Sequence, residues 1–235
     1  MSVPTLFVLI PNLGTTHNPP PRVLYTDDWL LVVEKPAGML SVAGRGPAGE
    51  DCLHARLRQR WPDAMVVHRL DMATSGLMVF ARGERAQRAL SIAFADRAVD
   101  KRYVAIVAGR PHAGNPDDEG WSTIDLPLAA DWPARPRQKV DAVNGRPSLT
   151  RWRTAREARC AWDGGTRLEL QPVTGRSHQL RVHLAAIGHP VMGDTLYAPE
   201  PLARAAPRLL LHASCLALAH PADGRPVAWR STAPF

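Results

Sequence analysis

Short apolar runs separated by polar turns recur along most of the chain, and this pattern predicts strands. Two of these runs, Val23–Thr26 and Trp29–Glu34, flank a pair of aspartates in the manner of a hairpin. Further apolar or alternating runs predict strands at 64–67, 77–80, 101–107, 149–155, 166–171, 209–218 and 226–230.

Two segments have the residue spacing of helices instead. In 84–97, apolar residues recur at intervals of three and four, and in 52–61 Leu53 and Leu57 share one face. Residues 111–120 are rich in Pro, Gly and Asp and indicate a loop. Runs of strands with few helices between them predict an α+β fold with a mostly antiparallel sheet.

The chain of 235 residues is long enough to bury a full core. Residues 1–21 end in Asn18 followed by three prolines and show no repeating pattern, so we expect a tail there. From Arg22 onward we expect one continuous domain, 22–235.

Composition narrows the class of partner. The net charge is +7 and nearly all the cations are arginine, whose side chain binds phosphate through two parallel hydrogen bonds. This balance favours a polyanionic partner, although a solvated basic surface or the base composition of the genome would also produce it. The three cysteines form no CxxC pair, which argues against a zinc ribbon or a disulfide framework. The apolar run Leu6–Ile10 is too short to span a membrane, and we expect a cytoplasmic protein.

The most informative segment is the nonapeptide His68–Gly76, which reads HRLDMATSG. It follows one predicted strand and precedes another, so Asp71 lies at a boundary between strand and loop. A carboxylate surrounded by His, Arg, Thr and Ser at such a boundary indicates chemistry or recognition. The alternative is an aspartate that closes an ordinary turn.

Three further segments have the same character. Lys101–Val107 is a predicted strand, and Pro172–Leu184 passes from a strand through a glycine turn into a helix. Arg208–Ala213 opens the last apolar strand. In this order and at this spacing, the segments together with His68–Gly76 resemble the RluA-type family of pseudouridine synthases.

The resemblance extends from about Arg22 to the C-terminus. The run Asp131–Val140, with Met72 and Ala73, resembles the dual-specificity branch of the family, which acts on a tRNA anticodon-loop uridine and a 23S rRNA hairpin uridine. The implied fold is a bent, mostly antiparallel mixed sheet with flanking helices and loops. Many relatives carry a separate N-terminal RNA-binding domain. We expect none here, so the catalytic domain alone would recognise RNA.

The resemblance also implies catalytic residues. Conversion of uridine to pseudouridine breaks the N1–C1′ bond, rotates the uracil and rejoins it through C5. Asp71 matches the catalytic aspartate, and it either attacks the sugar or assists loss of the 2′ proton. Arg176 matches the active-site arginine, whose charge would keep that carboxylate ionised. Its alternative role is that of a helix-entry arginine bound to a loop carbonyl. Tyr103 matches the aromatic that stacks on the target base, with its hydroxyl a candidate for proton transfer at C5; a core tyrosine is the alternative.

RNA contacts are expected around these motifs. Arg69 would fill the gap left when the target uridine leaves its stack, unless it forms a salt bridge within the sheet. The other expected contacts are cations and histidines close to the motifs: His68, Lys101, Arg135, Arg137, Lys139, His178 and Arg181. The cations that follow Trp132 form a basic, proline-rich loop, although a charge run is often only a solvated face. Arg181 and His183 share the helix after Arg176 and would reach RNA or solvent.

Other classes of protein fit less well. His178 and His183 lie on different faces of a helix, and Asp71 has no second carboxylate partner, which argues against a metal-dependent or glycosidase-like hydrolase. A catalytically silent RNA-binding or ribosome-assembly module would share the basic face, but a carboxylate in its cleft would repel the ligand. We expect RNA as the partner, no membrane, no metal, no cofactor and a monomeric protein.

Overall fold

The computed structural model describes residues 21–44, 46, 49–113, 116–155 and 162–235. By their backbone contacts these residues form two compact units. The first holds the described residues up to Val99 together with Leu216–Ser231, and the second holds Asp100–Cys215 together with Thr232–Phe235. Strand β11 (Leu211–Ala219) contributes to both units. The single domain expected from Arg22 stays a prediction, and all but one residue of the expected tail lies outside the described residues.

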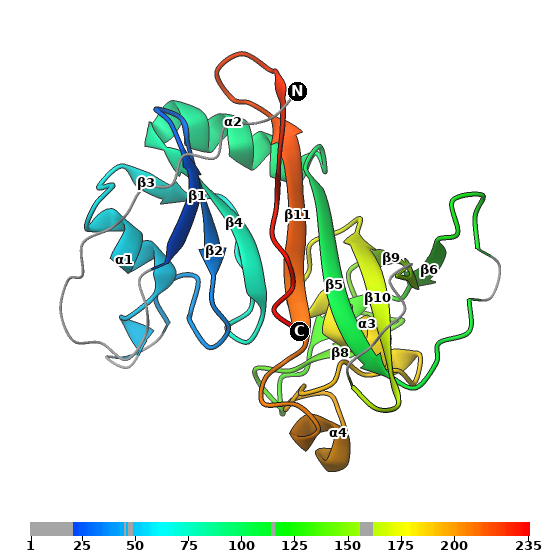
Figure 1. Ribbon diagram of the computed structural model, residues 1–235. Coiled ribbons are helices and arrows are strands. Elements are labelled where there is room, and N and C mark those ends of the chain that lie inside the picture. Colours follow the sequence, from blue (N-terminus) through cyan, green and yellow to red (C-terminus); the bar gives the residue numbers. More distant parts are fainter. Residues whose placement is uncertain (1–20, 45, 47–48, 114–115, 156–161) are drawn as a thin grey trace. The chain divides into compact units, whose positions relative to one another are not determined.

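The first unit is built on antiparallel strands (Figure 1). β1 pairs with β2, β2 pairs with β4, and β3 pairs with the C-terminal end of β4. The hairpin predicted around Asp27 is confirmed, because β1 and β2 are its arms and the Asp27 carboxylate accepts hydrogen bonds from the N–H groups of Trp29 and Leu30. The elements of this unit are β1 (Arg22–Thr26), β2 (Leu30–Lys35), α1 (Leu53–Arg58), β3 (Ala64–Val66), β4 (Ser75–Arg82), α2 (Gly83–Ala95) and β12 (Pro226–Arg230).

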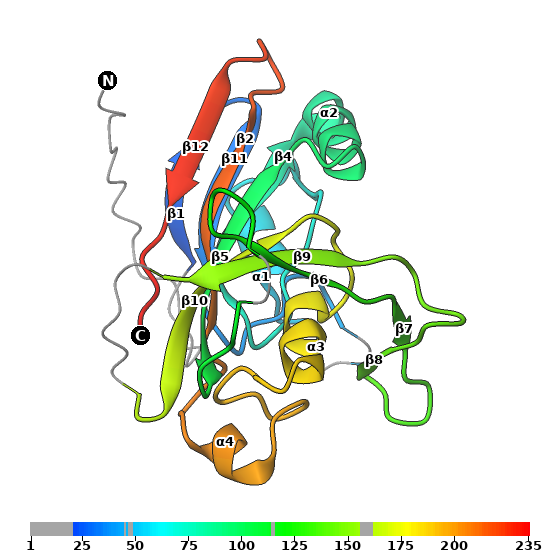
Figure 2. The same cartoon turned by 90° about the vertical axis from the view of Figure 1, so that its right-hand side faces the viewer.

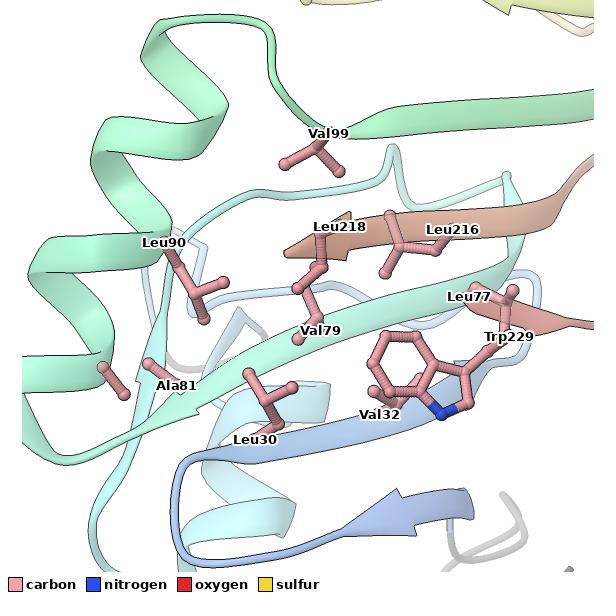
Figure 3. Close-up of a cluster of buried hydrophobic side chains, with 11 residues drawn as sticks. Leu30, Val32, Leu77, Val79, Ala81, Leu90, Val99, Leu216, Leu218 and Trp229 are labelled. Carbon is pink, nitrogen blue, oxygen red and sulfur yellow. The ribbon is translucent and has the colours of Figure 1, made fainter. Parts of the chain in front are cut away.

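The central strands β2 and β4 are buried on both faces, as their nearly continuous apolar sequences require. On one face Val79 lies in a cluster with Leu90 of α2 and Trp229 of β12 (Figure 3). On the other face the ring of His54, in α1, stacks on Phe80 with 6.0 Å between centroids. Burial of a large apolar side chain stabilises a fold by about 1.5–3 kcal/mol. Strand β4 is therefore held firmly, and so is the end of the loop that leads into it.

The second unit contains the antiparallel strand order β5-β10-β9-β6 and a separate two-stranded sheet of β7 and β8. Helix α3 packs against β8, β9 and β10 (Figure 2). The elements of this unit are β5 (Asp100–Ala108), β6 (Ser122–Asp125), β7 (Leu128–Ala130), β8 (Gln138–Val140), β9 (Leu149–Thr154), β10 (Gly165–Pro172), α3 (Gln179–Ala186) and α4 (Glu200–Arg204).

The predicted α+β fold with a mostly antiparallel sheet is confirmed. The helix predicted at 52–61 forms the shorter α1, and the helix predicted at 84–97 forms α2, which begins one residue and ends two residues earlier. One local prediction is partly wrong: the basic run 131–140 is not all loop, because Lys139 lies in β8 opposite Ala129. Strands as short as β7 and β8 leave too little alternation in the sequence to be detected. None of the described helices is long and apolar enough to cross a membrane.

Candidate active site

The loop that carries Asp71 joins β3 to β4, and its first histidine fastens it to the sheet. β3 ends at Val66, which pairs with Phe80. Just beyond that pair, Nε2 of His68 accepts a hydrogen bond from the N–H of Val79 at 3.0 Å, and the ring stacks on Phe94 with 4.6 Å between centroids. The side chain thus replaces strand pairing where the chain leaves the sheet. His68 has a structural role in the first unit, and its contact with RNA stays a prediction.

The residues on either side of Asp71 are held by the segment that follows β2. The hydroxyl of Ser41 accepts from the N–H of Leu70 at 3.1 Å and donates to the carbonyl of Leu70 at 2.7 Å. The carbonyl of Met72 accepts from the N–H of Gly38 at 2.8 Å and from Nζ of Lys35 at 3.0 Å. We call residues 35–41 the clamp. Hydrogen bonds to both neighbours of Asp71 constrain the backbone on either side of it, which is the constraint that a functional carboxylate requires.

Lys35 is the unusual member of the clamp, because its side chain is fully buried at the end of β2. Its ammonium also donates to the carbonyls of Pro36 and Met39, each at 2.8 Å. A lysine is almost never buried completely unless such partners satisfy it. Gly38, at φ +82°, allows the tight turn that brings these carbonyls together. Sequence reasoning missed the clamp; its signal was a lysine followed by Pro-Ala-Gly at the end of an apolar strand.

Two exposed side chains flank the half-buried Asp71. Arg69 is exposed and makes no ion pair with any described residue, so the salt bridge within the sheet that was its alternative role is not formed. Met72 is 53% exposed, although methionine is more often buried. The loop therefore presents a cation and a flexible apolar group on the two sides of the carboxylate.

Arg176 lies in the turn between β10 and α3, and a buried glutamine fixes its backbone. Oε1 of Gln179 accepts from the N–H of Arg176 at 3.1 Å and from the hydroxyl of Thr174 at 2.7 Å. Nε2 of Gln179 donates to the carbonyl of Leu149 and to the hydroxyl of Thr150, both at 3.0 Å. Both acceptor sites and both donors of the amide are used, so the turn is attached to β9. Sequence reasoning did not single out Gln179.

The guanidinium of Arg176 is only weakly held within the protein. Its Nη2 lies 3.5 Å from the carbonyl of Pro147, at the outer limit for a hydrogen bond. Its Nε is buried and has no hydrogen-bond partner among the described residues. A buried N–H without a partner costs about 1–3 kcal/mol. The group therefore has hydrogen-bonding capacity that a ligand can satisfy, and a simple helix-entry role accounts for it poorly.

The structure overturns the expectation for Arg181. The residue is 3% exposed, and its Nε and Nη2 bind the two oxygens of Asp194 at 2.7 and 2.6 Å. Breaking a buried pair of this kind costs about 3–5 kcal/mol, so this guanidinium is not available to RNA phosphate. His183 is also fully buried, bonded to the hydroxyl of Thr150 and the carbonyl of Leu126, and burial lowers its pKa. Helix α3 is buried on nearly every side. With only eight residues, it is too short for the periodicity of its sequence to show this burial.

Lys101 and Tyr103 lie on one face of β5, because alternate residues of a strand share a face. Tyr103 pairs across the sheet with Leu170 and is half-buried. Lys101 is half-buried as well. Burial lowers the pKa of its ammonium, and the neighbouring carboxylate of Asp100 opposes that shift.

The turn between β7 and β8 carries exposed cations. Arg135, Arg137 and Lys139 are exposed, and the guanidinium of Arg135 lies 3.3 Å from the ring centroid of Trp132, which is itself 68% exposed. The hydroxyl of Tyr197 is bonded both to the start of β8, at Gln138, and to His178 at the start of α3. The structure thus brings together two predicted RNA-binding segments through a tyrosine that sequence reasoning missed.

The described residues contain no group of three or more His, Cys, Asp and Glu placed to hold a metal ion. Of the three cysteines, Cys52 is buried, Cys215 is half-buried, and Cys160 lies outside the described residues.

Comparison with known proteins identifies the family. The model for RNA pseudouridylate synthases matches residues 29–186. The dual-specificity RNA pseudouridine synthase RluA of Escherichia coli O6:H1 is 47% identical over 224 residues, which cover 93% of this chain and 98% of that protein. The protein of the same name from Vibrio vulnificus is 48% identical over 201 residues, with 85% and 78% covered.

Solved structures agree with this assignment. Human RNA Pseudouridylate Synthase Domain Containing 1 superposes with a TM-score of 0.73 at 30% identity, covering 95% of this chain and 87% of that chain. Human RNA Pseudouridylate Synthase Domain Containing 4 shares the fold, with a TM-score of 0.67 at 23% identity over 91% and 88% of the two chains. From the matched motifs, the fold and these relatives, the chain belongs to the RNA pseudouridylate synthase family.

Proposed function

We propose that this RNA pseudouridine synthase modifies uridines in structured loops of two RNA classes, 23S rRNA and the anticodon loop of tRNA. The isomerase activity follows from membership of the family. The observation that carries the dual substrate is the 47% identity, over nearly the full length of both chains, to a relative named for dual specificity. A catalytically silent RNA-binding module is not favoured, because a relative this similar is named as a synthase.

In this proposal Asp71 is the catalytic carboxylate. The N1–C1′ bond breaks, a C5–C1′ bond forms, the hydrogen of C5 is lost to water and N1 takes up a proton, so no oxidant is needed. Attack on the sugar and assistance in removing the 2′ proton both begin from the ionised form of Asp71. The support is its placement, since the clamp holds the residues before and after it.

Arg176 and Tyr103 complete the proposed catalytic set. Arg176 provides the cation of the reaction, and the support is its buried Nε, which no described group satisfies. Tyr103 provides the aromatic ring that stacks on the target base, and the support is a side chain that is half-buried on β5. Stacking of a base on an aromatic ring contributes about 1–3 kcal/mol.

The remaining RNA contacts are proposed for exposed or half-exposed cations. Arg69 fills the place of the extruded uridine, and exposed Arg135, Arg137 and Lys139 bind phosphates, as half-buried Lys101 does. His68 and His178 support the loops next to these contacts, because both already hold hydrogen bonds within the protein.

The proposal includes a cytoplasmic, monomeric enzyme that works without metal or cofactor. It also includes one catalytic domain formed by both compact units, because the family match at residues 29–186 takes in parts of each.

The test is release of tritium from C5-labelled uridine in two transcripts, a tRNA anticodon stem-loop and a 23S rRNA hairpin. Asp71→Asn keeps the size of the side chain and removes its charge. The matched control is Asp28→Asn, an exposed aspartate in the turn between β1 and β2. We expect release from both RNAs with wild type and the control, and none with Asp71→Asn. Release from one RNA only would refute dual specificity, and tight binding without release from either would refute the enzymatic function.

A further inference from the structure

One side-chain hydroxyl in the second unit joins two segments that the proposed function uses. The hydroxyl of Tyr197 accepts a hydrogen bond from the N–H of Gln138, the first residue of β8, at 2.8 Å. The same hydroxyl lies 2.6 Å from Nδ1 of His178, the residue that begins α3. Gln138 directly follows Arg137 in the pair of strands β7 and β8 with their connecting turn (128–140), which we call the basic hairpin. His178 lies two positions after Arg176 in the turn between β10 and α3 (173–178), which we call the arginine turn. The hydroxyl therefore lies between the basic hairpin and the arginine turn.

Tyr197 is itself fixed by buried charges. Oδ1 of Asp194 accepts from the N–H of Tyr197 at 3.2 Å and from the N–H of Leu196 at 2.9 Å. Asp194 is fully buried and binds Arg181 of α3 through two hydrogen bonds. The guanidinium of Arg181 also lies 5.0 Å from the centre of the Tyr197 ring. The buried Arg181 of α3 therefore holds Tyr197 in place, both through Asp194 and through its contact with the ring.

His178, which Tyr197 contacts, has an unusual backbone conformation. Its φ is +54°, in the left-handed region that non-glycine residues seldom adopt. Such a conformation persists only where the surroundings determine it. These surroundings include the Tyr197 hydroxyl and the edge of the Tyr197 ring, which meets the imidazole at 5.6 Å and 82°. In sequence, this strained residue separates Arg176 and Ser177 from the first residue of α3, so its conformation sets the direction of the arginine turn.

We propose that Tyr197 is a positioning residue for Arg176, because its hydroxyl fastens the basic hairpin at Gln138 to the strained His178 that ends the arginine turn. The inference rests on the proposed role of Arg176. The inference assigns separate tasks to the ring and to the hydroxyl: the ring packs against Arg181 and Arg137, and the hydroxyl sets the geometry of the turn.

A second consequence concerns RNA binding. Arg137 carries a proposed phosphate contact, and the N–H of the next residue is bonded to the Tyr197 hydroxyl. Displacement of the hairpin by bound RNA is therefore passed to His178 through one shared atom. Loss of the hydroxyl uncouples the two segments without removing any cation.

The experiment replaces only the hydroxyl. Tyr197→Phe keeps the ring and its contacts, and we expect kcat for tritium release to fall about tenfold or more with KM for RNA changed less than threefold, because small misplacement of a catalytic group is costly. The matched control is Tyr25→Phe in the first unit, which loses a hydroxyl bonded to Asp27 at 2.6 Å. The control is expected to keep kcat within twofold of wild type. A loss of kcat in both variants, or in neither, overturns the proposal.

A double-mutant comparison tests whether the effect passes through Arg176. If Tyr197 acts by positioning that guanidinium, Tyr197→Phe lowers the residual activity of Arg176→Lys by less than about twofold. Multiplicative losses in the double variant overturn the positioning role, since they indicate independent contributions.

A third measurement needs no activity. Amide hydrogen exchange, read by mass spectrometry, is expected to speed up by about tenfold in peptides covering 137–140 and 176–182 of Tyr197→Phe, and in neither peptide of Tyr25→Phe. Unchanged exchange overturns the inference. If wild type makes no pseudouridine, the proposed function fails, while exchange still decides whether Tyr197 fastens the two segments.

Discussion

Removal of the Ser41 hydroxyl tests how the clamp holds Asp71. Ser41 is 2% exposed, and its hydroxyl bonds both backbone groups of Leu70, the residue before the proposed catalytic carboxylate of Asp71. In Ser41→Ala the N–H and the carbonyl of Leu70 both lose that partner. Leu70 is only 5% exposed, so water replaces the hydroxyl poorly.

The expected magnitude follows from these two groups. A buried polar group left unsatisfied costs about 1–3 kcal/mol, so we expect the free energy of unfolding to fall by about 3 kcal/mol. For chains of 150–250 residues each kcal/mol lowers Tm by roughly 2–4 °C, which gives a fall of about 6–12 °C. Because Asp71 is the next residue, we also expect kcat to fall about tenfold or more.

Two assays read the two effects. Thermal unfolding followed by circular dichroism gives the change in Tm, and tritium release at a temperature well below both midpoints gives kcat. The control is Ser91→Ala, an exposed position on α2 where the change should stay within about 0.5 kcal/mol. A stability loss below about 1 kcal/mol would refute the energetic reasoning. A clear loss of stability with kcat unchanged would show that the clamp does not position Asp71.

Four further predictions follow from individual side chains. Tyr103→Ala lowers kcat/KM for tritium release at least tenfold, because it removes one stacking interaction with the base. Tyr103→Phe keeps the stacking, and full activity in this variant would exclude a chemical role for the hydroxyl. Arg69→Ala impairs modification of a folded hairpin more than of an unstructured strand, because extrusion costs a few kcal/mol only from a stack, and equal losses in tritium release would contradict the flipping role. Neutralising Arg137 and Lys139 with glutamine weakens binding to all RNAs and reduces the slope of log K against log salt by about 1 per cation; filter binding across a KCl series measures the slope, and an unchanged one would speak against phosphate contacts. Burial lowers the pKa of His183 in the folded protein, so below the unfolded value of about 6.5 the unfolded chain takes up a proton that the folded chain does not. The free energy of unfolding therefore falls as pH drops from about 7 to 5, and His183→Asn reduces this dependence. Urea unfolding at each pH measures the free energy, and the same pH dependence in wild type and His183→Asn would contradict a role for His183 in it.

Several features could be predicted from the sequence because they depend on neighbours in the chain. Strand β4 and helix α2 follow from the periodicity of their own residues, and the hairpin of β1 and β2 follows from two apolar runs around Asp27. The family follows from short motifs, and the proposed roles of Asp71 and Arg176 rest on the same motifs, since the chemistry requires those residue types in a fixed local order. These features depend on residues that are close in sequence, so the spacing of residues along the chain is enough to predict how they lie relative to one another.

Other features depend on contacts between distant residues, and only the tertiary structure decided them. Arg181 has the charge and position of a surface residue, yet it is buried because Asp194, 13 residues away, satisfies it. The hydroxyl of Ser41 meets a residue 29 positions further on, and the hydroxyl of Tyr197 meets one 59 positions before it. A polar side chain can be buried only where its partner is, and the place where two segments meet is set by the packing of whole strands and helices. The sequence therefore determined the family and the candidate catalytic residues, and the fold determined which residues hold those candidates in place.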